Sequence, residues 1–185
     1  LITKTLKGDI TKEEAEGALQ FKVTNKSNGN YEIYTLKDFT YNETEQRYER
    51  VIPANVGEYE VEETIYDVDG YVTDSVKYSI DGGAMTDGSE TKAIVSKDTV
   101  TTVAFEDAYT KDEGKLVLTK TIKGDETKEE AEGALQFKVT ETATGKSTTY
   151  TLKDFTYDVA TGVYTLELKV KSGTYTVEET IYDIH

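Results

Sequence analysis

The 185-residue sequence contains no cysteine and no tryptophan, and only one proline, one methionine and one histidine. Without cysteine there is no disulfide framework, no thiolate zinc or iron–sulfur site and no cysteine nucleophile. The single histidine is the last residue, His185, which excludes a Ser-His-Asp triad and a metal site with several histidine ligands. We expect neither a metal site nor a cofactor.

Basic residues are also scarce. The sequence has 21 Lys and Arg against 36 Asp and Glu, which gives a net charge of −15 at pH 7. Nucleic acids and anionic membrane surfaces attract basic proteins, so neither partner is expected. No apolar run approaches the roughly 18 residues that predict a membrane span. We recognise no signal peptide or lipidation motif, and we expect no membrane insertion in this span.

The sequence repeats itself at the length of a whole domain. Residues 2–67 align without a gap with residues 118–183, and 39 of these 66 pairs are identical. The segment TKEEAEGALQFKVT, for example, occurs at 11–24 and again at 127–140. A repeat of this length predicts tandem duplication of a domain rather than a solenoid of short units.

The repeat defines the expected domain boundaries. The first copy extends over 1–110, the segment KDEG at 111–114 predicts a short linker, and the second copy occupies 115–185. This second copy lacks the counterpart of residues 70–110, about the last third of the domain. We therefore expect one complete domain followed by an incomplete one.

Short segments rich in Val, Ile, Thr, Tyr and Phe alternate apolar and polar residues, with Gly, Asn and Asp between them, which is typical of β-strands. Seven such strands predict an all-β fold: tandem Ig-like antiparallel β-sandwich domains. KEEAE at 12–16 predicts one helical turn, and DGGAMTDGSETK at 81–92 predicts a flexible loop. In the first copy we place the strands near 1–7, 18–24, 31–37, 46–52, 57–66, 71–80 and 99–109.

A lysine interrupts the apolar face of the first strand. Side chains alternate between the two faces of a strand, so Ile2, Lys4 and Leu6 share one face, and Lys120 occupies the same place in the second copy. A lone ammonium buried in a core is unfavourable. We therefore expect Lys4 to be paired, neutralised or consumed in a reaction.

Two acidic residues interrupt apolar faces in the same way. In GEYEVEETIYD, Glu63 shares a face with Val61 and Ile65, and Glu179 is its counterpart in the second copy. In TVTTVAFEDAYT, Asp107 shares a face with Val103, Phe105 and Tyr109. Three strands thus each direct one charged side chain into the predicted core.

These motifs resemble the intramolecular isopeptide domains of Gram-positive surface proteins, such as the B-type (Cna-B-like) repeats of collagen adhesins and the backbone pilins of streptococcal pili. The resemblance rests on the TKTxKG lysine, the YxVEET glutamate and the VxFxDxY aspartate, in that order. It implies that Lys4 is the nucleophile, Asp107 the acyl partner and Glu63 the proton shuttle. One feature departs from the family pattern, because the acyl partner is Asn in most members and Asp in a subset.

The same resemblance makes Lys120 the counterpart of the nucleophile and Glu179 the counterpart of the proton shuttle in the second copy, where the acyl partner is missing. Such a partial domain would accept a strand donor from another chain. The bond forms once per molecule, so the protein is not expected to be an enzyme that turns over. The expected partners are neighbouring domains of the same surface protein, and a host ligand if the protein is itself an adhesin.

Two other interpretations of the inward charges stay open. In the first, Lys4, Glu63 and Asp107 form a buried ion-pair network without a covalent bond. In the second, the Lys4 side chain reaches water at the edge of its strand. The segment from Asp67 to Gly70 has part of a calcium-loop pattern but lacks its remaining ligands, so a plain turn is the better interpretation.

The leading hypothesis is a structural module, the stalk of an adhesin or the shaft of a pilus, outside the cell and attached to the wall of a Gram-positive bacterium. The alternative is a ligand-binding adhesin domain that recognises a host protein or glycan. A glycosidase built on paired carboxylates ranks last, because Lys4 already accounts for the inward acids.

Overall fold

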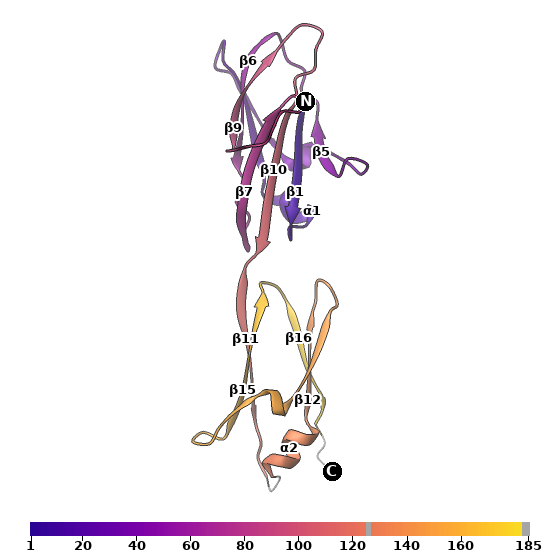
Figure 1. Cartoon of the computed structure of the whole chain (residues 1–185), viewed down its shortest axis with the longest axis vertical. Helices are drawn as coiled ribbons and strands as arrows, with labels where there is room; N and C mark the ends of the chain where they lie inside the picture. The colour runs from indigo at the N-terminus through magenta and orange to yellow at the C-terminus, as the bar shows by residue number, and fades with distance from the viewer. Residues whose placement is uncertain (125–126, 183–185) are drawn as a thin grey trace. The chain divides into compact units, whose positions relative to one another are not determined.

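The computed structural model describes residues 1–124 and 127–182, and it divides into two units, Leu1–Asp112 and Glu113–His185 (Figure 1). Each unit consists of strands with one short helix, which confirms the predicted all-β Ig-like sandwich fold. None of the helices within the described residues has the length and hydropathy of a membrane span.

Unit 1 is a sandwich of two sheets. One sheet has the order β4-β5-β1-β10-β7-β8 and the other has the order β3-β2-β6-β9. The elements of unit 1 are β1 (Ile2–Gly8), α1 (Lys12–Ala18), β2 (Gln20–Asn25), β3 (Tyr31–Thr35), η1 (Leu36–Asp38), β4 (Thr40–Asn42), β5 (Arg47–Arg50), β6 (Gly57–Ile65), β7 (Tyr71–Ile80), β8 (Thr86–Asp87), β9 (Glu90–Val95) and β10 (Val103–Lys111). The two sheets enclose a core whose largest buried apolar side chains include Phe21, Tyr48, Phe105 and Tyr109.

One strand pair differs from the antiparallel pattern that the sequence predicts. The first and last strands of unit 1, β1 and β10, are neighbours and run parallel, in a register that places Ile2 opposite Val103 and Leu6 opposite Asp107. Both strands lie inside the six-stranded sheet, β1 between β5 and β10, and β10 between β1 and β7. The two ends of the domain sequence therefore meet in the middle of one sheet.

Unit 2 contains two three-stranded sheets, β11-β15-β14 and β13-β12-β16. Its elements are β11 (Glu113–Thr121), α2 (Lys128–Ala134), β12 (Gln136–Glu141), β13 (Ser147–Thr151), η2 (Leu152–Asp154), β14 (Thr156–Asp158), β15 (Val163–Lys171) and β16 (Tyr175–Ile181). Within its described residues, unit 2 has no counterpart of β7 to β10. Its core contains Leu135, Phe137, Leu152 and Tyr164.

The two segments predicted to be loop or linker contain strand. The boundary between the two units falls within the predicted linker over 111–114, after Asp112, but β10 ends at Lys111, β11 begins at Glu113 and only Asp112 lies between them. The predicted loop over 81–92 contains β8 and the start of β9. The strand β9 was missed because its inward residues, Thr91 and Ala93, are small and weakly apolar.

The helix α1 extends the single turn that the sequence predicts to seven residues. It begins with a capping box: the Thr11 side chain accepts a hydrogen bond from the amide of Glu14, and the Glu14 carboxylate accepts one from the amide of Thr11. The same box, between Thr127 and Glu130, begins α2. This T-x-x-E signal is readable in both copies and explains why both helices start at the same position.

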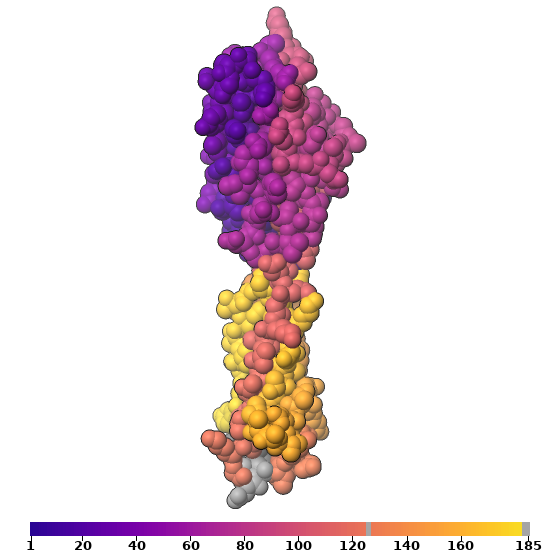
Figure 2. Space-filling model, turned by 90° about the vertical axis from the view of Figure 1, so that its left-hand side faces the viewer, coloured from indigo at the N-terminus to yellow at the C-terminus, as the bar shows by residue number. Residues whose placement is uncertain are grey.

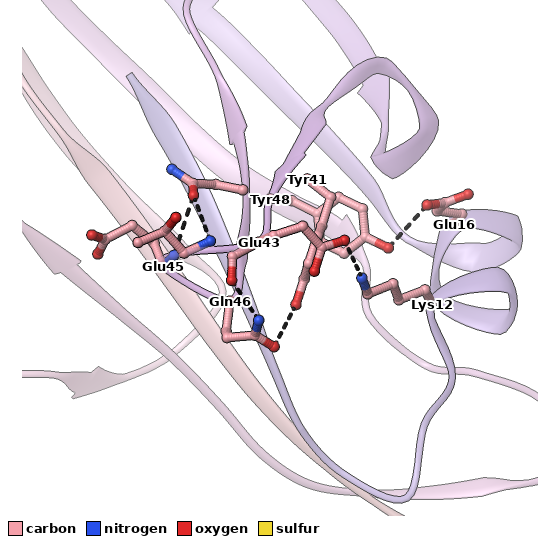
Figure 3. A network of polar contacts seen from close by, with 9 residues as sticks. Lys12, Glu16, Tyr41, Glu43, Glu45, Gln46 and Tyr48 are labelled. Atoms are coloured by element: carbon pink, nitrogen blue, oxygen red, sulfur yellow. Dashed lines mark hydrogen bonds and ion pairs between the residues drawn. The ribbon is translucent and has the colours of Figure 1, made fainter.

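Polar contacts hold α1 against the β4–β5 hairpin (Figure 3). The Lys12 ammonium lies 3.3 Å from the Glu43 carboxylate and 3.3 Å from the centre of the Tyr41 ring. The Tyr48 hydroxyl donates a hydrogen bond of 2.9 Å to Glu16. Only Tyr48 among these residues is buried. We therefore regard this cluster as a structural contact that fixes the helix to the hairpin.

Gly8, at the end of β1, allows the close approach of β10. Its φ is +84°, and a Cβ at this position would lie 2.0 Å from the backbone oxygen of Tyr109. We expect Gly8→Ala to destabilise unit 1 by at least about 1–3 kcal/mol, because it adds backbone strain and a clash that no side-chain rotation relieves.

Gly17→Ala is the matched control, since a Cβ on Gly17 in α1 meets nothing within 4 Å. This variant is expected to stabilise the unit slightly, by up to about 1 kcal/mol. Urea unfolding of the two variants measures both effects. Equal stabilities would contradict the close packing of β1 on β10.

Candidate functional site

Three charged side chains meet in the core of unit 1. The Lys4 ammonium nitrogen lies 2.7 Å from Oε1 and 2.8 Å from Oε2 of Glu63, and it also contacts Oδ2 of Asp107. The side chains of all three residues are fully shielded from solvent. Lys4 therefore does not reach water at the strand edge, and that interpretation is wrong.

Strand register explains the encounter. Lys4 on β1 lies opposite Phe105 on β10, and Asp107 lies two residues further along β10 on the same face. Glu63 comes from the other sheet, where it lies opposite Phe21 on β2. The nucleophile and the acyl partner that the sequence predicts thus occupy neighbouring parallel strands, and the glutamate faces them from across the sandwich.

Aromatic rings line this cluster. The rings of Phe21 and Phe105 pack with their centres 5.6 Å apart, and the Lys4 ammonium lies 5.9 Å from the centre of the Phe21 ring. Both phenylalanines and Tyr109 are fully buried. Such surroundings have a low effective dielectric constant, so they favour the neutral forms of amines and carboxyls.

The electrostatics of the site are most evident at Glu63. The pKa of Glu63 is raised to about 8: burial is the main cause and the neighbouring Asp107 adds to it, whereas Lys4 opposes the shift. Glu63 therefore holds a proton through most of the neutral range. A carboxylic acid of this kind both donates and accepts a proton near neutral pH, which is the requirement for a proton shuttle.

Tyr109 is a member of the site that the sequence placed on the correct face but to which it assigned no role. Its hydroxyl lies 2.9 Å from Oδ2 of Asp107 and 2.8 Å from the backbone oxygen of Tyr66. Burial and the nearby acids raise its pKa, so the hydroxyl stays protonated. Oδ1 of Asp107 is buried without a hydrogen-bond partner. Tyr109 thus fixes one oxygen of the carboxyl group and leaves the other free.

Unit 2 holds the corresponding pair. The Lys120 ammonium lies 2.7 Å from Oε1 of Glu179, but the two side chains are 26% and 28% exposed. Among residues 113–124 and 127–182, the structure shows no ion pair for Lys120 other than the one with Glu179. No strand equivalent to β10 supplies a third group there.

Other candidate sites carry less chemistry. The described residues contain no cluster of three or more acidic or histidine side chains arranged to hold a metal ion. Asp67, from the partial calcium-loop pattern, accepts a hydrogen bond of 3.0 Å from the Thr73 hydroxyl.

A cavity in unit 1 has a volume of about 660 Å³ and opens near Leu1, between the two sheets. Residues 52–55 form part of its wall. Their equivalents in unit 2, residues 168–171, instead lie in β15 and pair with β11 over Glu113 to Leu116. We assign no ligand to this cavity.

No family model and no curated protein matches the chain. Three similar solved structures are the Bacillus anthracis TIE protein (22% identity, TM-score 0.44), a C-terminal fragment of the pilus adhesin SpaC from Lactobacillus rhamnosus GG (17%, 0.39) and SpaC itself (17%, 0.41). They align with 97%, 96% and 97% of this chain, which spans 27%, 74% and 24% of theirs, respectively. Similarities at these values transfer no function to this chain.

Proposed function

We propose that this chain is a structural module of a bacterial cell-surface adhesin or pilus, in which an amide bond between Lys4 and Asp107 joins the first and last strands of unit 1. The observation that carries this proposal is the meeting of a buried amine, a buried carboxyl and a buried glutamate with a raised pKa within contact distance. A buried ion pair alone would often be no more stabilising than apolar residues of the same size.

The reaction balances as a condensation. Glu63 gives its proton to an oxygen of Asp107 and takes one up from the Lys4 ammonium, and the neutral amine then attacks Cγ of Asp107. A C–N bond forms, Glu63 passes a second proton from the nitrogen to the same oxygen, the C–O bond breaks, and the oxygen leaves as water. The folded strands hold the reacting atoms together, and positioning of this kind lowers a barrier by up to about 7–11 kcal/mol.

The bond suits a protein that bears load outside the cell. It closes a loop of about 100 residues, and a cross-link of that span lowers the entropy of the unfolded chain by the equivalent of about 4–5 kcal/mol, as a disulfide would. The sequence has no cysteine with which to make disulfides. Attachment to a Gram-positive cell wall, as a stalk or a shaft, is the setting that the motif resemblance supplies.

The rate of bond formation is expected to fall as the pH rises above about 8, because Glu63 then lacks the proton that it must supply to the oxygen of Asp107. The decrease should approach about tenfold per pH unit, as for the loss of one proton. The measurement uses chain recovered unfolded from insoluble expression, refolded by dilution at a series of pH values and sampled by mass. A rate that keeps rising from pH 7 to pH 10 would contradict the role of Glu63.

A further inference from the structure

The two oxygens of the Asp107 carboxyl group have different surroundings. Oδ2 contacts the Lys4 ammonium and lies 2.9 Å from the Tyr109 hydroxyl oxygen. Oδ1 is buried and has no hydrogen-bond partner. The same holds for Oε1 of Glu63, which contacts the Lys4 ammonium but accepts no hydrogen bond. Buried polar atoms in native proteins are nearly always hydrogen-bonded, so two unpaired oxygens in one site need an explanation.

A proton held between the two acids explains both unpaired oxygens. Burial is the main cause that raises the pKa of Glu63, and a hydrogen bond with Asp107 adds to it. One carboxyl group donates a hydrogen bond to another only when it is protonated. We therefore assign the Glu63 proton to the space between its Oε1 and Oδ1 of Asp107. In the reaction of the proposed function, on which this inference rests, Oδ1 then receives the proton and leaves as water, and Oδ2 remains as the amide oxygen.

Oδ2 becomes negatively charged when the amine attacks. The electron pair of the Lys4 nitrogen forms the bond to Cγ of Asp107, and one electron pair of the C=O bond moves onto Oδ2. The side chains of Lys4, Glu63 and Asp107 are fully shielded from solvent. Figure 2 shows a continuous surface over unit 1 on the side turned to the viewer. A donor of the protein, rather than bulk water, therefore has to stabilise the charge on Oδ2.

The Tyr109 hydroxyl lies where such a donor is needed. It is 2.8 Å from the backbone oxygen of Tyr66 and 2.9 Å from Oδ2 of Asp107, and its single proton points to one of them at a time. While the Lys4 ammonium neutralises Oδ2, the proton is free to pair with Tyr66. Once Lys4 is a neutral amine, a turn about the bond between ring and oxygen directs the proton to Oδ2. This hydrogen bond is then strongest in the transition state, which is the condition for accelerating a reaction.

We propose that Tyr109 is a catalytic residue of bond formation, because its hydroxyl stabilises the negative charge on Oδ2 of Asp107 while Lys4 attacks. When the tetrahedral intermediate collapses, the C=O bond at Oδ2 is restored and the bond from Cγ to Oδ1 breaks. Oδ1 leaves as water with the two protons that Glu63 delivers. Tyr109 neither gains nor loses a proton, so its role differs from that of Glu63.

The fold holds Tyr109 in this position. Its side chain is fully buried, and its ring packs edge-to-face on that of Tyr71 with the ring centres 6.4 Å apart. Its backbone oxygen accepts a hydrogen bond of 2.8 Å from the amide of Asp9. The pairing of β10 with β7 shifts register between Ala108 and Tyr109, which leaves Asp74 as an extra residue on β7. Such bulges are frequent next to active sites, where they redirect a side chain.

The test compares the rate of bond formation in the parent chain and in Tyr109→Phe, which keeps the ring and removes the hydroxyl. Chain recovered unfolded from insoluble expression is refolded by dilution at neutral pH and sampled by intact mass for the loss of one water. Circular dichroism follows folding in parallel, so that slower folding is not counted as slower chemistry. We expect Tyr109→Phe to lose water about 10²–10³-fold more slowly, the usual effect of removing one donor to an oxyanion.

Tyr48→Phe is the matched control. Tyr48 is also buried, at 1% exposure, and its hydroxyl donates a hydrogen bond of 2.9 Å to Glu16 on α1 rather than to the Asp107 carboxyl. This variant should lose water at the rate of the parent chain. Stability is measured separately by urea unfolding of both tyrosine variants in a Lys4→Ala chain, which cannot form the bond. The two variants should there lose similar stability.

The outcomes separate this role from the proposed function. A parent chain that never loses water overturns both. If the parent chain loses water and Tyr109→Phe does so at the same rate, the amide bond stands and the role of Tyr109 is wrong. The role is equally wrong if Tyr48→Phe is slowed as much as Tyr109→Phe, or if Tyr109→Phe alone fails to fold in the Lys4→Ala chain, because the hydroxyl then serves only packing.

Discussion

Under denaturing conditions, the intact chain is expected to weigh one water less than its sequence requires. The deficit arises because the condensation of Lys4 with Asp107 releases water and because the amide, unlike an ion pair, survives denaturation. Replacing Lys4 by alanine removes the nucleophile and should restore the full mass. Intact-mass spectrometry of the two proteins is sufficient for the measurement.

The repeat provides a matched control for this experiment. Lys120→Ala changes the counterpart lysine in unit 2, which has no acyl partner among the described residues, and it should leave the deficit unchanged. Asp107→Asn should instead lose ammonia, which identifies residue 107 as the acyl partner. A parent chain of full mass would reduce the cluster of Lys4, Glu63 and Asp107 to a buried ion-pair network.

A third variant tests the glutamate without removing either reacting group. Glu63→Gln keeps the size and the hydrogen-bonding capacity of the side chain but cannot accept and return a proton. The variant should fold, because Lys4 and Asp107 still pair, and bond formation should slow by about 10²–10⁴-fold, the usual contribution of general acid–base catalysis. An undiminished rate would show that Glu63 acts only as a counter-ion.

Much of this site was predictable from the two-residue period of β-strands. That period alone places Lys4, Glu63 and Asp107 on inward faces, and the structure brings all three together. It does not determine which strands are neighbours, so the contact between β1 and β10 and its parallel direction emerge only from the fold. The role of Tyr109 was hidden for the same reason, because its second contact is the backbone oxygen of Tyr66 in a distant segment.

The errors in the fold have a common cause. Strand prediction depends on bulky apolar residues at alternate positions, and β9 directs Thr91 and Ala93 inward instead. Charged and glycine residues at 111–114 are typical of a loop, yet these positions belong almost entirely to strands because pairing with β7 and β15 continues to Lys111 and from Glu113. In both places tertiary pairing overrode local composition.

Pulled from its two ends, the parent chain is expected to show one unfolding event, whereas the Lys4→Ala variant, which cannot form the bond, shows two. In the parent, force enters unit 1 near Lys4 and leaves near Asp107, so the amide carries it and the loop of about 100 residues between them never extends. Unit 2 has no such bond within its described residues and should release roughly 200 Å or more of chain, at about 3.4 Å per residue.

The unlinked variant supplies the contrast within the same molecule. Unit 1 of Lys4→Ala should add a second event of roughly 300 Å or more, since about 110 residues become free to extend. Single-molecule force spectroscopy distinguishes the two lengths, and the event from unit 2 is an internal reference in every trace. Because β1 and β10 are parallel neighbours, force on the unlinked pair shears their hydrogen bonds together and gives measurable resistance before rupture. If the parent also shows the longer event, the bond does not lie in the path of the force, and the load-bearing role would be wrong even where the mass deficit is present.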